Sequence, residues 1–288
     1  MVNQAEIQSE VRQFYDQIGW QSVGEGVYQN ARYEDLRVVS REYIHQCHVR
    51  VKHHLKSSGK YLLDAGSGPI QYPEYLTYSE NYDFRVCLDL SRVALVEAQQ
   101  RLGDKGLYVV ADVSKLPFKS DVFDAVVSLH TLHHLNLAAQ RRSYLELHRC
   151  MAPATSGVLV NGWTHSVLMS RLKWLVSFME WFGRLIVRLR GKARDLPRTP
   201  QPSQAANPAQ PTGTFIEKLD YAWIEQEIAP HMRIELRVWR SVSVRFLRAV
   251  IHQPYGKWLL RFLYWWEERL PRWMGRIGQY PLLVIYKD

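Results

Sequence analysis

Residues 61–68 read Tyr61-Leu62-Leu63-Asp64-Ala65-Gly66-Ser67-Gly68, a short apolar run that ends at two glycines. Such a run predicts a buried strand followed by a tight turn. Glycines allow the backbone to turn sharply and to approach a ligand closely. In a Rossmann-like sheet this turn lies at the carboxyl ends of the strands, where ligands bind.

The same alternation continues on both sides of this turn. Amphipathic helices are predicted over residues 3–17 and 34–54, before the first strand. Further short strands are predicted at 85–89, 107–112, 123–129, 157–160, 232–238 and 280–286, with helices over 93–102, 138–150, 217–228 and 258–270. Short apolar strands that alternate with helices predict an α/β fold with a doubly wound, mostly parallel sheet.

The glycine turn does not match the dinucleotide-binding pattern. That pattern needs a third glycine, and Gln71 occupies its position, while Pro69 follows the second glycine. The acidic Asp64 would also repel a phosphate and suits a cationic ligand. A nicotinamide oxidoreductase is therefore disfavoured.

Two more acids end the next two predicted strands. Asp89 is placed to accept both hydroxyls of a ribose, and Asp112 to accept an amino group, with the backbone N–H of Val113 beside it. A single acid at such a place is more often a turn residue than a ligand. Three acids at the ends of successive strands, next to a glycine turn, together predict a ligand site at this edge.

These motifs resemble the class I methyltransferases that use S-adenosylmethionine (SAM). Residues 62–68 are similar to their motif I, and residues 88–91 (Leu-Asp-Leu-Ser) to their motif II. Residues 111–118, 123–126 and 146–149 are similar to the type 11 small-molecule branch, which includes quinone-biosynthesis methyltransferases. The resemblance covers roughly residues 58–161. One departure is the turn at 151–157, where the family has Lys-Pro-Gly-Gly.

The resemblance implies a Rossmann-like, seven-stranded sheet that binds SAM. The methionine part of SAM is expected near the glycine turn, the ribose at Asp89 and the adenine at Asp112. The full set of expected cofactor-binding residues is Asp64, Gly66, Ser67, Gly68, Asp89, Leu90, Asp112, Val113 and Leu129.

Three histidines follow the fourth predicted strand, at His130, His133 and His134. This region usually faces the transferring methyl in the family, so they are the catalytic candidates, because a histidine is a suitable base at neutral pH. Capping or packing roles stay open for each. A metal site is disfavoured because no carboxylate or cysteine is near in the sequence. Expected substrate-pocket residues are Tyr15, Tyr28, Tyr72 and Trp163, with packing as the alternative.

The second half of the chain differs in charge. Residues 1–160 carry 17 Lys and Arg against 18 Asp and Glu, whereas residues 161–288 carry 20 against 10. Large apolar residues recur at helical spacing between Leu168 and Leu189, beside basic ones, which predicts a long amphipathic arm over residues 163–194. The proline-rich stretch 197–213 predicts a flexible loop. We expect this insert to be a lid over the substrate entrance, with a membrane-surface helix as the alternative.

The chain therefore divides into N-terminal cap helices (1–57), a SAM-binding core (58–162), a helical and proline-rich insert (163–214) and a C-terminal part that completes the sheet (215–288). Cys47, Cys87 and Cys150 lack metal-ligand spacing, and no signal peptide is visible. We expect a cytoplasmic protein, with peripheral contact to an anionic inner membrane as an added feature. Nucleic acid is a disfavoured partner, because the basic residues are interleaved with large aliphatics.

The expected function is methyl transfer from SAM to a small or lipid-like acceptor by in-line displacement. The alternative is a SAM-binding scaffold or regulator that transfers nothing. The motifs argue for binding and leave turnover open.

Overall fold

A seven-stranded sheet forms the centre of the molecule in the computed structural model, which describes residues 4–20, 22–24, 27–29, 34–189 and 214–288. The strands lie in the order β5-β4-β3-β6-β7-β9-β8, and only β9 is antiparallel to both of its neighbours. Their bounds are β3 Gly59–Ala65, β4 Tyr82–Asp89, β5 Gly106–Val110, β6 Phe123–Leu129, β7 Met151–Val160, β8 Arg233–Arg240 and β9 Tyr280–Lys287. This confirms the predicted Rossmann-like, seven-stranded sheet.

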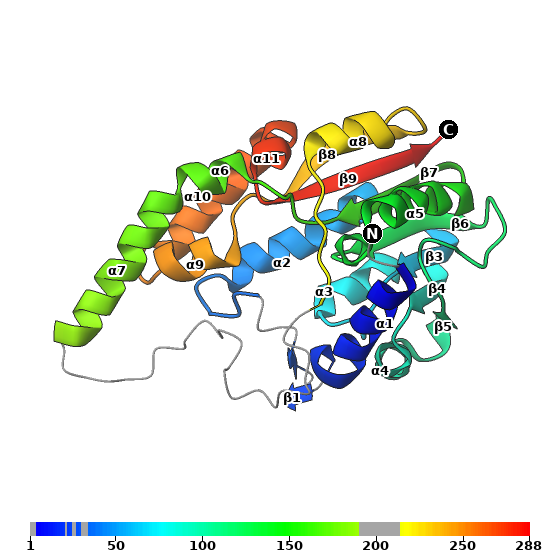
Figure 1. Cartoon of the computed structure of the whole chain (residues 1–288), viewed down its shortest axis with the longest axis horizontal. Coiled ribbons are helices and arrows are strands. Elements are labelled where there is room, and N and C mark those ends of the chain that lie inside the picture. The colour runs from blue at the N-terminus through cyan, green and yellow to red at the C-terminus, as the bar shows by residue number, and fades with distance from the viewer. Residues whose placement is uncertain (1–3, 21, 25–26, 30–33, 190–213) are drawn as a thin grey trace.

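Helices cover both faces of this sheet (Figure 1). They are α1 Gln4–Phe14, α2 Arg41–Val49, α3 Pro73–Leu76, α4 Arg92–Leu102, α5 Leu137–Cys150, α6 Val167–Arg171, α7 Lys173–Leu189, α8 Tyr221–Glu227, α9 Val244–Val250, α10 Gly256–Arg269 and α11 Pro271–Ile277. A short separate hairpin is formed by β1 Ser22–Gly24 and β2 Val27–Tyr28.

Alternation along the strands divides the core into two layers. Leu62 and Leu63, adjacent on β3, point to opposite faces, and both are fully buried. Leu63 belongs to the layer that packs under α5 and α8, and Leu62 to the layer under α2, α9 and α10. Because successive side chains of a strand face opposite ways, a doubly covered strand is apolar throughout. The carboxyl edge of the sheet is left open between the layers.

The amphipathic arm is two helices, α6 and α7, with α7 packed against α9. Glu180 on α7 pairs with Arg245 on α9 at 2.8 Å. Figure 1 shows α7 extending away from the sheet at the end opposite β5. The predicted flexible loop at 197–213 lies outside the described residues.

Candidate functional site

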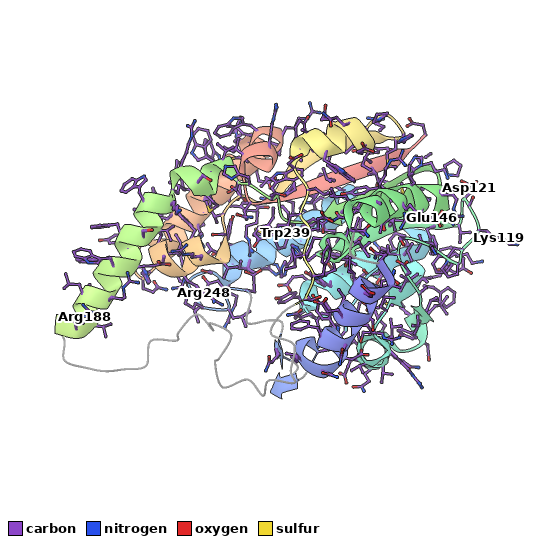
Figure 2. All side chains as sticks on the ribbon, in the orientation of Figure 1. Lys119, Asp121, Glu146, Arg188, Trp239 and Arg248 are labelled. Atoms are coloured by element: carbon purple, nitrogen blue, oxygen red, sulfur yellow. The ribbon has the colours of Figure 1, made fainter. Side chains whose placement is uncertain are left out.

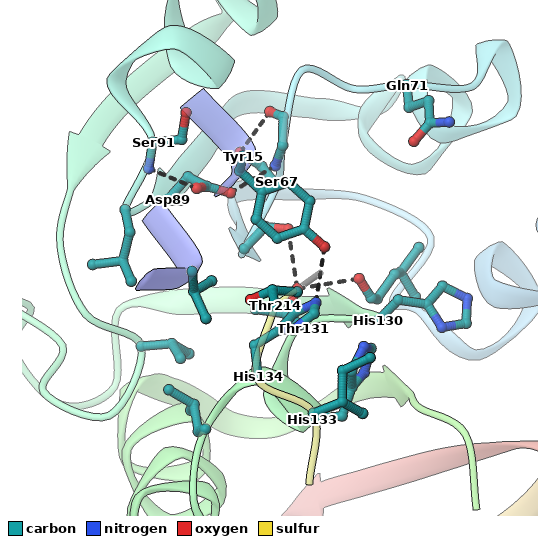
Figure 3. Close-up of a pocket in the computed structure, with 18 of the residues that line it drawn as sticks. Tyr15, Ser67, Gln71, Asp89, Ser91, His130, Thr131, His133, His134 and Thr214 are labelled. Atoms are coloured by element: carbon teal, nitrogen blue, oxygen red, sulfur yellow. Dashed lines mark hydrogen bonds between the residues drawn. The ribbon is translucent and has the colours of Figure 1, made fainter. Parts of the chain in front are cut away.

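A cavity of about 530 Å³ opens at the carboxyl edge of the parallel strands. Side-chain contacts divide its lining into two groups. The glycine-turn end comprises Gly66, Ser67, Gly68, Leu88, Asp89, Leu90, Ser91, Ala111, Asp112, Val113, Leu129 and Thr131, and the Arg240 end comprises Glu34, His48, Tyr72, His130, Lys218, Trp239, Arg240 and Tyr280. Figure 3 shows Asp89 and Ser91 on one side of the cavity and His130 and His133 on another.

The glycine turn needs both of its glycines. Gly66 and Gly68 have φ of 77° and 55°, the left-handed region that residues with a side chain rarely adopt. A Cβ on Gly66 would overlap the side chain of Thr131, and one on Gly68 would come within 3.0 Å of Trp20. The protein's own side chains therefore crowd this turn and require the glycines. The sequence alone suggested a different reason, the close approach of a ligand.

Asp89 ends β4 and lies in the cavity wall. One of its carboxylate oxygens accepts the backbone N–H of Gly68 at 2.9 Å, and the other accepts that of Ser91 at 2.8 Å. These bonds fix the plane of the carboxylate. Burial raises the pKa of Asp89 to about 6, against the lowering effect of the Ser91 and Gly68 hydrogen bonds. The site therefore holds a desolvated acid with a defined orientation.

Asp112 and Val113 follow β5 and also line the cavity. The Asp112 carboxylate accepts hydrogen bonds from the Ser114 backbone N–H at 2.8 Å, the Ser114 hydroxyl and the Gln8 amide. Gln8 belongs to α1, so the N-terminal helix covers this part of the cavity. Leu90 and Leu129, two further predicted cofactor residues, lie in the same wall.

Asp64 is the predicted cofactor residue that does not line the cavity. It is 4% exposed and pairs with Arg85, whose guanidinium donates two hydrogen bonds to Oδ2 of Asp64. Burial raises the pKa of Asp64, although the Arg85 charge opposes that shift. The expectation that Asp64 attracts a cationic ligand is corrected, because Arg85 already compensates its charge. An arginine inside the apolar strand β4 was the signal for this pairing.

His130 has an unusual backbone and a buried ring. Its φ is 55°, and its ring packs edge-on against Trp239 and Tyr280, with centroids 4.8 and 5.7 Å away. Burial, together with the nearby Arg240 charge, lowers the pKa of His130 to about 3. The imidazole is therefore neutral at physiological pH. Residues held in the left-handed region concentrate at functional sites, where the surrounding structure enforces them.

His133 and His134 are held by different partners. Nδ1 of His133 lies 3.2 Å from Oδ1 of Asn161, which fixes the ring as an Nδ1–H donor. His134 contacts the Phe215 carbonyl through Nδ1 at 2.9 Å and the Tyr15 hydroxyl through Nε2 at 2.8 Å. Burial lowers the pKa of His133 well below its ordinary value and that of His134 to about 4. Both nitrogens of His134 are thus occupied.

Only some of the predicted substrate-pocket residues lie in the cavity wall. Tyr15 and Tyr72 line the cavity. Trp163 does not: it is 3% exposed in the core, and its Nε1 donates to the Gly275 carbonyl at 2.8 Å, so its expected pocket position is corrected. The side chain of Tyr28 lies outside the described residues.

Apart from Tyr72 and His130, the residues of the Arg240 end were not predicted from the sequence. These residues come from distant segments, with Glu34 before α2, His48 on α2 and Trp239 and Arg240 at the end of β8. Arg240 donates to Oε1 of Glu34 at 2.5 Å, and both residues are buried. The only available signal was an arginine at the end of a strand that faces the core.

Of the described part of the insert, Thr214, its last residue, is the one that reaches the cavity. Residues 163–189 contribute nothing to the lining, whereas Thr214, Ile216 and Lys218 do. A lid over the substrate entrance stays a prediction for the segment that lies outside the described residues.

Within the described ranges, no three metal-ligating side chains gather at one point. No helix in these ranges combines the length and the apolarity that crossing a bilayer requires.

Comparison with known proteins agrees with this geometry. Residues 63–159 match the family described as "Methyltransferase domain", of type 11. No curated protein sequence matches the chain. Among solved structures, the chain is similar to the [4+2]-cyclase SpnF, with 16% identity, a TM-score of 0.54 and coverage of 98% of this chain and 97% of that one.

Two further structures share the fold. One is Haemonchus contortus phosphoethanolamine N-methyltransferase 2 in complex with SAM, with 15% identity, a TM-score of 0.53 and coverage of 96% of this chain and 60% of that one. The other comes from the complex between the Haloferax volcanii Trm112 methyltransferase activator and a methyltransferase, with 15% identity, a TM-score of 0.51 and coverage of 87% and 92%.

The cavity fits the cofactor of this family. A glycine turn in the cavity wall and an oriented carboxylate at Asp89 provide the backbone edge and the acceptor that SAM requires. Residues 63–159 therefore match a type 11 methyltransferase domain, a family whose cofactor is SAM.

Proposed function

We propose that this protein transfers the methyl group of SAM to a small or lipid-like acceptor bound at the Arg240 end of the cavity. One observation carries the proposal: a single cavity joins the family's motif residues to a second set of side chains that has no place in those motifs. A transferase needs such a continuous space, because donor and acceptor must meet without water between them.

In the proposed SAM-binding site, Asp89 accepts hydrogen bonds from the ribose hydroxyls, and Asp112 and Val113 contact the adenine. The two backbone hydrogen bonds to Asp89 support this role, because they leave its remaining lone pairs in a fixed direction. Gly66, Ser67 and Gly68 face the methionine part. Gln8 currently donates to Asp112, so an adenine amino group would share or replace that bond.

SAM supplies an activated methyl on a sulfonium, so the protein acts mainly by positioning and by excluding water. A base is needed only where the acceptor must lose a proton. His130 and His133 both line the cavity, but burial lowers the pKa of each, which makes each a weak base. His134 is the weakest candidate, since Tyr15 and Phe215 occupy both of its nitrogens.

Label transfer tests this function. The protein is incubated with methyl-labelled SAM and fractionated metabolite extracts, and the products are separated from unreacted donor. We expect time-dependent label in an acceptor, lost in Asp89→Ala. SAM binding with no label in any fraction favours the alternative, a SAM-binding scaffold or regulator. The likeness to SpnF, named as a cyclase, keeps this alternative in the design.

We also propose that the protein contacts an anionic membrane surface through two helices. Trp174, Phe178, Trp181 and Phe182 form one exposed stripe on α7, and Trp258, Phe262, Trp265 and Trp266 form another on α10, continued by Trp273 on α11. Trp174 is 70% exposed and Trp258 72%. Exposed apolar surface of this extent marks an interaction site.

The charges beside these stripes support a lipid partner. Lys173 flanks the α7 stripe, and Arg261, Arg269 and Arg272 flank the stripe on α10 and α11, all of them exposed. Tryptophan next to arginine and lysine is typical of helices that lie in the headgroup region of anionic bilayers. No residue of either stripe lines the cavity of the proposed active site, and Figure 2 shows Arg188, at the tip of α7, away from Trp239 in the cavity wall.

Vesicle flotation tests the contact at low salt. We expect binding to phosphatidylcholine vesicles that contain phosphatidylserine and none without it. The doubles Trp174→Ala/Trp181→Ala and Trp258→Ala/Trp265→Ala should each weaken it more than tenfold, at ~1.5 kcal/mol per buried tryptophan. Leu107→Ala, an exposed apolar residue on β5, is the control. Equal flotation of all variants, or burial of the face in a dimer by sedimentation, contradicts the proposal.

A further inference from the structure

The Arg240 end of the cavity has cationic donors that the protein does not use. Arg240 is 2% exposed, and its Nη1 donates to Oε1 of Glu34 at 2.5 Å. Its Nε is buried with no hydrogen-bond partner, and its Nη2 donates to no acceptor among the described residues. A buried donor without a partner costs free energy, so this guanidinium is incompletely satisfied by the chain alone.

Aromatic rings hold Arg240 in place. Its guanidinium carbon lies 5.0 Å from the Trp239 ring centroid and 4.7 Å from that of Tyr280. Burial opposes its charge, but Glu34 holds the pKa of Arg240 above the ordinary value, so it stays cationic. The charge therefore has a fixed position, and the walls around it are flat and apolar.

A second cation lines the same cavity. Lys218 is partly exposed at the cavity wall, and burial of part of its side chain lowers its pKa. A Cβ on Gly162 would lie 3.5 Å from both Lys218 Nζ and Tyr280 Cε1, so Lys218 borders the ring that stacks on Arg240. Within the part of the chain that the structure describes, Lys218 has no carboxylate partner.

Carboxylates do not balance these cations. Three acids line the cavity, and Asp89 and Asp112 belong to the glycine-turn end. Glu34 is the remaining one, and it already accepts from Arg240 and from the Asp35 backbone N–H. Of the two histidines at this end, His48 and His130, the latter has a pKa lowered to about 3 and is neutral. The Arg240 end is thus net positive, with aromatic walls.

We propose that the acceptor is an acid: its carboxylate or phosphate group binds Arg240, with Lys218 as second cation, and its apolar body lies against Trp239 and Tyr280. This deepens the proposed function, on which it rests, by naming the acceptor's chemical class. Arginine is suited to this role, because its planar fork matches both oxyanions.

Three probes that share a phenyl ring test the proposal. Benzoate carries a carboxylate, phenyl phosphate a phosphate and benzamide no charge. Binding is measured by calorimetry to the protein alone and to the protein saturated with S-adenosylhomocysteine (SAH). We expect at least one anion to bind tenfold or more tightly than benzamide, and the tighter of the two identifies the oxyanion.

Variants assign the binding to this place. Arg240→Lys keeps a charge for Glu34 but removes the spare donors, and Lys218→Gln alters a partly exposed residue, so both should fold. We expect each to weaken the anion about tenfold while SAH affinity stays within twofold of wild type. Arg233→Gln, on the same strand but exposed, is the matched control and should change nothing.

Two results overturn the proposal: neither anion binds more tightly than benzamide, or both variants retain wild-type anion affinity. A failure of the proposed function looks different. In that case SAH does not bind, whereas the preference for anions is still measured on the protein alone.

Discussion

Binding of SAM in the proposed site depends most directly on the Asp89 carboxylate. Its oxygens accept the backbone N–H groups of Gly68 and Ser91 at 2.9 and 2.8 Å, which leaves further lone pairs for two ribose hydroxyls. Hydrogen bonds to a charged acceptor contribute ~1.5 kcal/mol each, so losing both costs ~2–3 kcal/mol of binding. Asp89→Ala should therefore weaken SAM about 30- to 150-fold.

Titration calorimetry with SAM measures this loss, and Asp104→Asn, at an exposed acid after α4, serves as control. Asp89→Asn keeps one acceptor oxygen and should fall between wild type and Asp89→Ala. Thermal unfolding of each variant checks that the glycine turn survives. SAM affinity within threefold of wild type in a folded Asp89→Ala would refute the ribose assignment.

Further predictions follow from the same site. Because ionised Asp89 accepts both ribose hydroxyls and burial raises its pKa to about 6, SAM affinity should be level above that pH and fall below it, by no more than the loss expected for Asp89→Ala, and a pH series on Asp89→Asn should be flat. His130→Gln or His133→Gln should lower turnover by about 100-fold at unchanged SAM affinity if that residue is a base; full activity in both leaves packing roles only. Gly66→Ala should lower the free energy of unfolding, measured in urea, by ~1–3 kcal/mol, because its Cβ would overlap Thr131. Gly103→Ala is the control, since Gly103 also has a positive φ but open space around it, and equal losses in the two variants would contradict the overlap.

The sheet could be predicted because its signals are local. The central strands are short apolar runs, two of which end beside Gly66 and at Asp89, and strands covered on both faces show this apolar pattern clearly in the sequence. The period-two run at 232–238 was equally clear, and it became β8. Family motifs then placed the glycine turn and Asp112 at one edge.

Local sequence patterns did not predict which side chains meet across neighbouring strands. Asp64 was read as a ligand for a cation, because nothing near it in the sequence compensates its charge. Its partner Arg85 lies 21 residues away on the neighbouring strand. The predicted pocket position of Trp163 was wrong for the same reason, since the carbonyl that its Nε1 contacts, at Gly275, is 112 residues away.

The Arg240 end shows the same limit more strongly. Glu34 and Arg240 are 206 residues apart and meet only because β8 and β9 extend the sheet beyond β7. A single arginine in a basic half of the chain carries no local mark of burial. The exposure of the aromatic stripe on α10 was also not predicted, because aromatic side chains on a helix are expected to lie in the core.

A crystal structure of the SAH complex would show directly where the cofactor binds. We expect the ribose hydroxyls within hydrogen-bond distance of the Asp89 carboxylate, the adenine beside Asp112 and Val113, and the sulfur directed toward the Arg240 end. SAH bound outside this cavity, or with its adenine at the Arg240 end, would contradict this expectation.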